Sequence, residues 1–409
     1  MFKQRILDNQ ELIKNIKIIS RDYEFYNDLL KLNKIVSFIW PRRVWKTFLM
    51  YDFTKKLIKK WVLKLEQIVF LDFSLFSNYE IDPILLLKNY KELFPNLEPF
   101  FIFDEIQEIS NFKQFILTLF NKNYKIFLSW SNSNLLSSEL STHFRWRIFE
   151  YNILPLSFNE VLKFKNFEKQ KFYSTTKKAK LNNILKEILE FGSFPEIVLS
   201  QNNLFKIDNL KTYLNILIYK DLLERYKIDN EFSLRYLLKS LTIWFTKQVN
   251  INKIYNELKS QNIKIWKTTL YEYYEYVKNI FYISEISNFY SSKWAKKSFL
   301  YNLWFNKILW NNLNYWQSFE NLVFLELKKK YEKIYFKKKT NEIDFFIEDI
   351  NTNIQVCYNL NFKNLQREIK PFKNLEEKNI LIYFEKDEKI KNLENIELLN
   401  FFEFIEKIA

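Results

Sequence analysis

The N-terminal third of the chain alternates short, continuously apolar runs with stretches whose apolar residues recur at helical spacing. The apolar runs are typical of buried strands and lie at 35–39, 67–73, 100–103 and 124–129. Helical spacing extends over 46–60, where Phe48, Leu49, Phe53 and Leu57 fall near one face, and over 81–93. Buried strands that alternate with helices predict a parallel sheet covered by helices on both faces.

The middle of the chain predicts longer helices, and the C-terminal part predicts a second α/β region. Leu/Ile periodicity runs over 157–240 and breaks at Gly192-Ser193-Phe194-Pro195. Residues 250–285 predict a helix, a turn and a second helix, which small and polar residues around 266–269 would open as an N-cap. Within about 295–409 the pattern predicts an amphipathic helix at 318–330 and strands at 333–336, 343–347, 353–358 and 380–384.

Composition excludes several classes of protein and exposes one anomaly. Hydrophobic residues make up 48% of the 409, so the chain is not intrinsically disordered. A single cysteine, Cys357, and a single histidine, His143, exclude a disulfide scaffold, a cysteine-built zinc site and a multi-histidine metal centre. Average usage of about 7% would give roughly 29 glycines. The chain has one, Gly192, beside 11 tryptophans.

The net charge of +15 comes from 63 basic and 48 acidic residues. Abundant Lys, Asn, Ile, Phe and Tyr favour the codon usage of an AT-rich genome as its cause. A phosphate-rich partner such as nucleic acid is the alternative, because a basic surface attracts polyanions. No apolar run approaches the roughly 18 residues of a membrane span, and no signal peptide opens the chain. We therefore expect a soluble, cytoplasmic protein with no membrane partner.

The segment after the first predicted strand has the spacing of a phosphate-binding loop. It reads WPRRVWKT over 40–47, and glycine at Trp40 and Trp45 would turn it into the pattern G-x-x-x-x-G-K-[ST]. Such a loop needs glycine, because its backbone N–H groups wrap the phosphates in conformations that a Cβ disfavours. The predicted nucleotide-binding residues are Trp40, Pro41, Arg42, Arg43, Val44, Trp45, Lys46, Thr47 and Phe48.

Other tryptophans also stand where glycine would fit. Glycine at Trp130 would give G-S-N-S directly after a strand, and glycine at Trp146 would give R-G-R. The remaining candidates fall in turn-like or Lys-rich stretches. These candidates are Trp61, Trp266, Trp294, Trp304, Trp310 and Trp316. Scattered tryptophans ordinarily serve core packing or interfaces. Because two of them occupy the phosphate-loop glycines, we favour the hypothesis that a UGA codon read as glycine in the organism is translated here as tryptophan.

Two adjacent carboxylates, Asp104 and Glu105, follow the third apolar run. Taken alone, such a pair indicates a solvated strand end. Because it ends a strand that follows a phosphate loop, and open α/β sheets bind ligands at the carboxyl ends of their strands, the functional interpretation is favoured.

Several blocks together resemble a known group, the bacterial and archaeal AAA-like P-loop ATPases with a C-terminal domain of unknown function. Beside the loop, the N-terminal blocks are FIFDEIQEI at 101–109, LSWSNSNLLSSELSTHFRWR at 128–147 and PLSFNE at 155–160. The later blocks are FGSFPEIVL at 191–199, YKDLLERY at 219–226, SFENLVFLEL at 318–327, EIDF at 342–345 and IQV at 354–356. The resemblance covers most of the chain. The sequence departs from the family's pattern at the tryptophans.

The resemblance implies a role for each matching residue. Lys46 would reach the β- and γ-phosphates of ATP, and the Thr47 hydroxyl would hold Mg²⁺. Asp104 would bind the metal through water, and Glu105 would activate the attacking water. Ser129 or Ser131 would be the polar sensor, and Arg145 and Arg147 an arginine finger in cis or toward a neighbouring subunit. His143, beside them, is interpreted as structural.

The resemblance also implies a winged-helix domain and a restriction-endonuclease-like fold. DNA contact by the winged helix stays open, since Lys267 and several Tyr favour it while Glu272 and Glu275 would repel phosphate. The residues Glu320, Asp344 and Gln355-Val356-Cys357 fall where the nuclease fold places its metal carboxylates and its E-x-K. Gln replaces the glutamate and Cys the lysine, so a degenerate core used for folding or binding is favoured over an active nuclease.

The sequence therefore predicts an α/β protein in four parts: a P-loop ATPase domain at 1–155, a helical region at 156–240, a winged-helix-like domain at 241–295 and a restriction-endonuclease-like domain at 296–409. The expected function is Mg²⁺-dependent ATP hydrolysis coupled to a process that the sequence does not identify, with a link to nucleic acid left open. If the tryptophans are genuine, the alternative is a nucleotide-dead DNA-binding or scaffold protein, and a third hypothesis is a nuclease. ATP and Mg²⁺ are the expected ligands, and DNA and further copies of the chain are candidate partners.

Overall fold

The computed structural model describes residues 2–23, 26–39, 45–60, 62–76, 79–130, 144, 147–170, 172–310, 312–391 and 393–408. The chain divides into two compact units, Met1–Ile153 and Leu154–Ala409. The predicted end of the first domain, at residue 155, stays a prediction. The finer division of the second unit stays a prediction, and its proposed boundary at 295 falls inside a strand, Ser291–Leu300.

The first unit is built on a five-stranded parallel sheet in the order β2-β3-β4-β1-β5. Its strands are β1 (Ile35–Ile39), β2 (Ile68–Asp72), β3 (Phe100–Asp104), β4 (Lys125–Trp130) and β5 (Ile148–Asn152). β1 and β3 are buried along their whole length, which explains their continuously apolar sequence. The predicted parallel sheet is confirmed. β5 escaped prediction because its residues are half-buried or exposed and its sequence is mixed.

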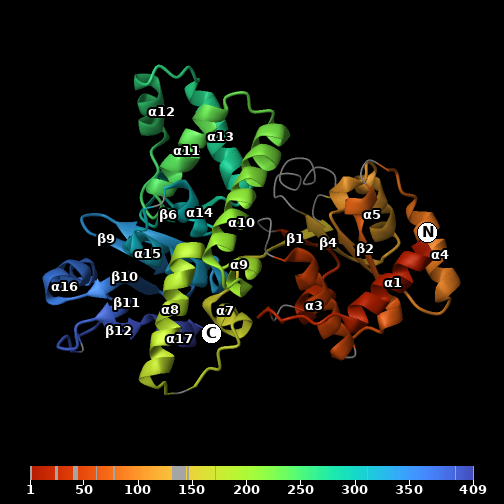
Figure 1. Cartoon of the computed structure of the whole chain (residues 1–409), viewed down its shortest axis with the longest axis horizontal. Coiled ribbons are helices and arrows are strands. Elements are labelled where there is room, and N and C mark those ends of the chain that lie inside the picture. The colour runs from red at the N-terminus through yellow and green to blue at the C-terminus, as the bar shows by residue number, and fades with distance from the viewer. Residues whose placement is uncertain are drawn as a thin grey trace. The chain divides into compact units, whose positions relative to one another are not determined.

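Helices cover this sheet on both faces, as the alternating pattern predicted. They are α1 (Phe2–Asn15), α2 (Tyr26–Lys31), α3 (Lys46–Lys59), α4 (Pro83–Leu93) and α5 (Phe112–Asn121), with short 3₁₀ turns η1 (Leu65–Gln67), η2 (Phe73–Phe76) and η3 (Ile106–Glu108). In Figure 1, α5 lies above the labelled strands and α3 lies below them. α3 follows β1 and buries Leu49, Phe53 and Leu57, so the predicted apolar face is the packed one.

The second unit contains a seven-stranded mixed sheet in the order β12-β11-β10-β9-β8-β6-β7. Its strands are β6 (Ile283–Asn288), β7 (Ser291–Leu300), β8 (Ile334–Lys338), β9 (Glu342–Ile347), β10 (Thr352–Leu360), β11 (Lys378–Lys386) and β12 (Glu397–Asn400). β10, β11 and β12 are parallel, whereas β8, β9 and β10 are joined antiparallel. The four strands predicted after residue 330 are confirmed, and the β6–β7 hairpin extends the same sheet through β8.

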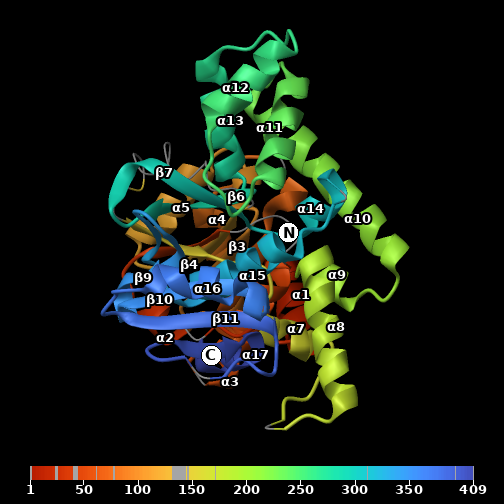
Figure 2. The same ribbon diagram turned by 90° about the vertical axis from the view of Figure 1, so that its left-hand side faces the viewer.

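Most of the remaining chain of this unit is helical. The helices are α7 (Phe158–Phe164), α8 (Thr175–Phe191), α9 (Pro195–Leu199), α10 (Asn203–Ile216), the π-helix η6 (Leu217–Glu224), α11 (Glu231–Ile243), α12 (Ile251–Ser260), α13 (Lys267–Asn279), α14 (Trp304–Leu309), α15 (Tyr315–Lys330), α16 (Phe362–Ile369) and α17 (Phe401–Ile408), with 3₁₀ turns η7 (Glu348–Ile350) and η8 (Lys370–Phe372). Figure 2 shows α11, α12 and α13 together, with β6 and β7 next to them. The helix, turn and second helix predicted over 250–285 are α12 and α13, and the last three residues of that range belong to β6.

Local sequence signals account for several helix ends. The PLSFNE block is a capping box, because the Ser157 hydroxyl accepts from the Glu160 N–H and the Glu160 carboxylate accepts from the Ser157 N–H. Asn250 and Asn314 cap α12 and α15 with their side chains. α13 begins at the predicted position, but its N-cap is Trp266, with no side-chain cap hydrogen bond.

Two of the three tryptophans predicted at turns within 304–316 lie in helices, and Trp310 is at a turn. Trp304 opens α14 and is buried, Trp316 lies within α15, and Trp310 is the residue that follows α14, at a φ of −119°. The turn prediction at Trp304 and Trp316 was wrong, because helical propensity and packing against Phe305 and Tyr358 decide these positions.

Asparagine supplies many of the backbone conformations that glycine ordinarily provides. Among the described residues, eleven non-glycine residues have positive φ, and six of them are asparagines: Asn123, Asn166, Asn262, Asn351, Asn374 and Asn395. Asn tolerates the left-handed region better than other residues with a Cβ, because its short polar side chain bonds locally to the backbone. Gly192, at φ +72°, ends α8 before the predicted helix break.

Candidate nucleotide site

The start of α3 places two predicted site residues at the carboxyl edge of the first sheet. Lys46 and Thr47 are the first two residues of the helix that follows β1. Trp45, directly before them, has φ 57° and ψ 53°, which is the left-handed conformation, and its ring centroid lies 4.9 Å from that of Phe48. Glycine adopts this conformation at little cost, whereas an L-residue with a Cβ pays roughly 1–2 kcal/mol. Trp40, Pro41, Arg42, Arg43 and Val44 lie outside the described residues.

Asp104 joins three elements of the site. It ends β3 and is buried, and its Oδ2 accepts a hydrogen bond from the Thr47 hydroxyl at 2.5 Å. Its Oδ1 accepts from the Ser129 hydroxyl on the neighbouring strand β4 and from the Glu105 N–H at 3.1 Å. Mg²⁺ prefers oxygen ligands such as hydroxyl and carboxylate groups. Thr47 and Asp104, which lie side by side, therefore fit the ion that the resemblance implies.

Glu105 is held in an uncommon backbone conformation beside Lys46. Its φ of 49° and ψ of 42° are left-handed, and its N–H also donates to the Ser129 hydroxyl at 3.2 Å. Its carboxylate forms an ion pair with the Lys46 ammonium and accepts a hydrogen bond from the Gln107 side chain. Strained backbone held by surrounding contacts is typical of functional positions. The structure therefore brings Lys46, Thr47, Asp104, Glu105 and Ser129 together.

Sequence reasoning missed three neighbours of this group. Gln107 lies two residues after Glu105 within the quoted FIFDEIQEI block. Asp72 ends β2 in register with Asp104 and was visible as the only carboxylate in the predicted strand 67–73. Burial, with the charges of Asp104 and Asp72, raises the pKa of Tyr51 to about 12. Tyr51 comes from the buried face of α3, where its sequence gave no separate signal.

Arg147 lies at the other edge of the sheet. It directly precedes β5, whose first residue pairs with Ile35 at the start of β1, so Arg147 is separated from Lys46 by the length of a strand. The side chain is exposed, and its guanidinium lies 5.9 Å from the centroid of the Phe120 ring. This placement does not support a role in cis. Ser131, His143 and Arg145 lie outside the described residues.

A second group of charged residues lies in the C-terminal unit. Glu320 lies on α15 and Asp344 on β9, and the Gln355 side-chain oxygen accepts from the Asp344 N–H at 3.4 Å. At their centre is the ammonium of Lys297 from β7, which sequence reasoning missed, 2.7 Å from Glu342, 3.5 Å from Glu320 and 3.6 Å from Asp344. Burial raises the pKa of Glu320 to about 8 and that of Asp344 to about 6, against the lowering effect of Lys297. Among the described residues, no three His, Cys, Asp or Glu are arranged to hold a metal ion.

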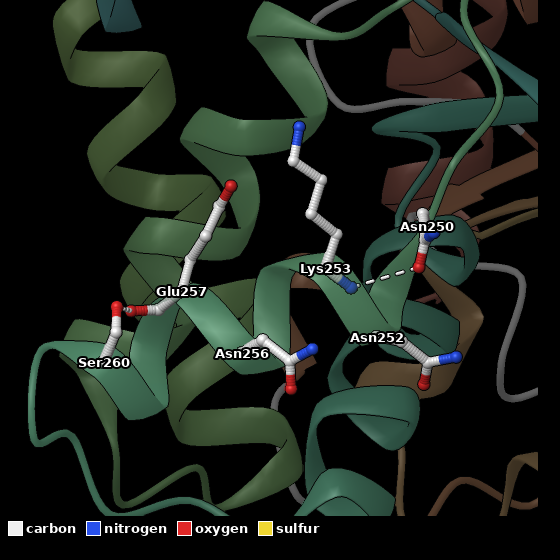
Figure 3. A pocket seen from close by; sticks show the side chains of 6 residues that line it. All are labelled: Asn250, Asn252, Lys253, Asn256, Glu257 and Ser260. Carbon is white, nitrogen blue, oxygen red and sulfur yellow. Dashed lines mark hydrogen bonds between the residues drawn. The ribbon is translucent and has the colours of Figure 1, made fainter.

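A polar hollow lies along α12. Figure 3 shows its lining side chains, with the Lys253 N–H donating to the Asn250 side chain at 3.0 Å. The lining residues are Asn250, Asn252, Lys253, Asn256, Glu257 and Ser260. The Lys253 ammonium lies 4.4 Å from the centroid of the Trp244 ring. The hollow therefore offers amides, a hydroxyl and charges of both signs.

Comparison with known proteins agrees with the geometry. Residues 32–162 match the family model of an AAA domain, and residues 182–300 match that of a domain of unknown function (DUF8612). The parallel sheet, the Lys46–Thr47 helix start and Asp104 define the first unit as an AAA-type P-loop NTPase domain. In the part of the chain that is described, no helix is long and apolar enough to span a membrane.

The chain belongs to the same family as the uncharacterized protein MJ1544 of Methanocaldococcus jannaschii. The two are 38% identical over 415 residues, which cover 95% of this chain and 90% of that protein. An uncharacterized protein of Haemophilus influenzae is 26% identical over 327 residues, covering 76% of this chain and 78% of its own.

Solved structures with a similar arrangement include a Walker-type ATPase, PABY2304, of Pyrococcus abyssi. It is 15% identical, covers 73% of this chain and 99% of its own, and has a TM-score of 0.45. The Orc1 protein of Aeropyrum pernix in complex with DNA is 8% identical, covers 74% of this chain and 96% of its own, and has a TM-score of 0.31.

Proposed function

We propose that the N-terminal unit binds ATP with Mg²⁺ and hydrolyses it. The observation that carries this proposal is the hydrogen bond between Thr47 and Asp104 beside the Lys46–Glu105 ion pair, all at the carboxyl edge of the sheet. Thr47 and Asp104 would hold the ion, directly and through water, and Mg²⁺ would neutralise charge on the β- and γ-phosphate oxygens.

The Lys46–Glu105 pair gives the site a resting state. Phosphate oxygens that enter compete with the Glu105 carboxylate for the Lys46 ammonium, since both are anions within its reach. Release of Glu105 leaves its carboxylate to orient the attacking water and accept its proton, while Ser129 and Gln107 hold the residue in place. Hydrolysis is then coupled to nucleotide binding, because the base becomes available only when phosphate occupies Lys46.

ATP hydrolysis by the purified chain with glycine at positions 40 and 45 tests this proposal. Lys46→Ala and Glu105→Gln should each lower the turnover number by about 100-fold or more, the size of effect seen when a charge-stabilising or proton-transferring group is removed. Lys59→Ala, an exposed change at the far end of the same helix, is the matched control and should leave turnover unchanged. Turnover that is indifferent to both site variants would exclude this site.

We further propose that glycine stands at positions 40 and 45 in the organism. The left-handed backbone at Trp45 supports glycine there, whereas Trp244 and Trp266 have φ of −104° and −80°, which any residue adopts. A UGA codon reassigned to glycine would account for tryptophan at both positions in the sequence. Mass spectrometry of the endogenous protein distinguishes the two residues, and UGG codons at 40 and 45 would contradict the hypothesis.

The position of Arg147 supports a proposal that ATP hydrolysis takes place between copies of the chain. An exposed arginine at the amino edge of one sheet suits contact with the carboxyl edge of a neighbouring copy, in a head-to-tail ring. Arg147→Ala and Lys46→Ala chains should each be inactive alone, and mixing them should restore part of the activity. If Arg147→Ala is as active as the parent chain, Arg147 does not contribute to the site of a neighbouring copy.

A second candidate function is binding of duplex DNA by residues 231–300. Its support is the order of elements: α11, a bridge between Gln248 and Lys297, α12, α13 and the β6–β7 hairpin, which is the order of a winged helix. Lys267 opens α13 and is exposed. Lys267→Glu should weaken DNA binding at least tenfold in fluorescence anisotropy, while Lys211→Glu, the same charge change on α10, should weaken it far less. Equal effects would indicate a non-specific response to net charge.

A further inference from the structure

The buried ammonium of Lys297 occupies the middle of a carboxylate centre in the C-terminal unit. Three carboxylates from two elements surround it, Glu320 from α15 and Glu342 and Asp344 from β9, all within 3.6 Å. The Lys297 residue is 2% exposed, so water screens these charges weakly. The ammonium carries a single positive charge, and three carboxyl groups face it.

Contacts that do not involve Lys297 hold Asp344 and the helix that carries Glu320. The Val356 N–H donates to Asp344 Oδ2 at 2.9 Å, which leaves Oδ1 toward the ammonium. The amide of Asn321, next to Glu320, donates to the Leu300 carbonyl at 2.9 Å and accepts from the Leu300 N–H at 2.7 Å, so α15 is held against β7. The positions of Asp344 and of α15 therefore do not depend on Lys297.

A second buried lysine shows that such crowding is not general in this unit. The Lys337 ammonium, with the residue 3% exposed, pairs with a single carboxylate, Glu377, at 2.6 Å and lies 3.5 Å from the centroid of the Phe346 ring. One carboxylate and one aromatic face satisfy it. Lys297 is therefore distinguished by the number of carboxyl groups around it, and several oxygen ligands at one point are what a divalent cation binds.

We propose that the Lys297 ammonium takes the place of a divalent cation, so that this carboxylate centre is closed by a side chain of the protein itself. Oxygen ligands surround Mg²⁺ or Mn²⁺ at about 2.0–2.2 Å, in the space that the ammonium fills. As long as Lys297 is present, the centre holds no metal. The C-terminal sheet then serves folding or binding and performs no metal-dependent cleavage at Asp344.

Removal of the lysine tests the proposal. In the full chain without nucleotide, we expect Lys297→Ala to gain one Mn²⁺ site by electron paramagnetic resonance, and Lys297→Ala/Asp344→Asn to lose it. Mn²⁺ should also raise the melting temperature of Lys297→Ala. The matched control is Lys337→Ala, which leaves one carboxylate. It should gain no Mn²⁺ site, and Mn²⁺ should not raise its melting temperature.

Two further measurements keep the test decisive if Lys297→Ala does not fold. Lys297→Met/Glu342→Gln removes one charge of each sign and leaves Glu320 and Asp344, and it should also gain the site. The wild-type chain should bind no Mn²⁺ that is sensitive to Asp344→Asn. Absence of a new site in both lysine variants, or an Asp344-dependent site in the wild type, would overturn the proposal.

Discussion

At the scale of the residue, the backbone conformation of two residues bears on the candidate nucleotide site. Trp45 and Glu105 both adopt the left-handed region beside the candidate nucleotide site, one before Lys46 and one after Asp104. For Glu105 the strain is offset by the ion pair with Lys46 and by two hydrogen bonds that its N–H donates, to Asp104 and to Ser129. For Trp45 the same conformation is the one that the loop pattern assigns to glycine.

We expect Trp45→Gly to strengthen nucleotide binding and to stabilise the first unit slightly. Relief of roughly 1–2 kcal/mol from the left-handed region is partly offset by about 0.5–1 kcal/mol of backbone entropy, so the net gain in unfolding free energy is small. Loss of the Cβ lets the loop backbone approach phosphate. Isothermal titration with ATP and Mg²⁺ measures the affinity. Trp266→Gly, at an exposed residue with negative φ, should leave affinity unchanged, and an equal gain there would contradict the explanation.

Glu320 makes stability depend on pH with a defined sign. Burial raises its pKa from 4.5 to about 8, so the folded protein holds this proton more tightly than the unfolded chain. Its favourable contribution to stability is complete below about pH 4.5 and is lost as the pH rises to about 8. Glu320→Gln cannot lose the proton, and we expect it to gain stability relative to the wild type between about pH 5 and pH 8 in urea unfolding. A constant difference across that range would contradict the shift.

At the scale of the element, strand ends and helix starts assemble the site. β3 delivers Asp104, β4 delivers Ser129, and α3 delivers Lys46 and Thr47, because the carboxyl ends of parallel strands meet at one edge of the sheet. The single glycine plays an element-scale role as well. Gly192 ends α8 where the chain passes Asn302, and a Cβ added there would lie 1.8 Å from the Asn302 side-chain oxygen.

Gly192→Ala should therefore destabilise the second unit. Positive φ and the clash with Asn302 both oppose a Cβ, and together they should lower the unfolding free energy by about 1–3 kcal/mol. Urea unfolding measures the change. Ser193→Ala, a buried neighbour on the same turn, is the control and should cost less. If the two variants are equally stable, the packing around Gly192 is looser than the backbone geometry indicates.

At the scale of the whole molecule, the chain consists of two compact units with separate cores, Met1–Ile153 and Leu154–Ala409. The first carries the AAA domain match, and the second contains the domain of unknown function together with the Lys297 centre. The β6–β7 hairpin belongs to the same sheet as the C-terminal strands, so the helices α11 to α13 and the C-terminal strands share one framework.

We expect the two units to respond separately to nucleotide. In hydrogen exchange of the chain with glycine at 40 and 45, a non-hydrolysable ATP analogue at 100 times its dissociation constant should protect the first unit by about 2.7 kcal/mol, because it binds only the folded site. The fragment 154–409 should unfold cooperatively and show no response to the analogue. Protection of the isolated fragment would place a nucleotide site in the second unit.

The sequence by itself determined four of the five strands of the N-terminal sheet, the helices α3 and α4, and the order of the site residues along this unit. Continuous apolar runs can be buried only in a covered sheet, and Lys46, Thr47, Asp104 and Glu105 follow such runs at fixed spacing. Only the tertiary structure decided which charges meet. Lys297 is one of many lysines in the sequence, and its contact with Glu320, Glu342 and Asp344 depends on strand register and helix packing between segments far apart in the chain. The distance of Arg147 from Lys46 was decided in the same way, because a parallel sheet places the two ends of a strand at opposite edges.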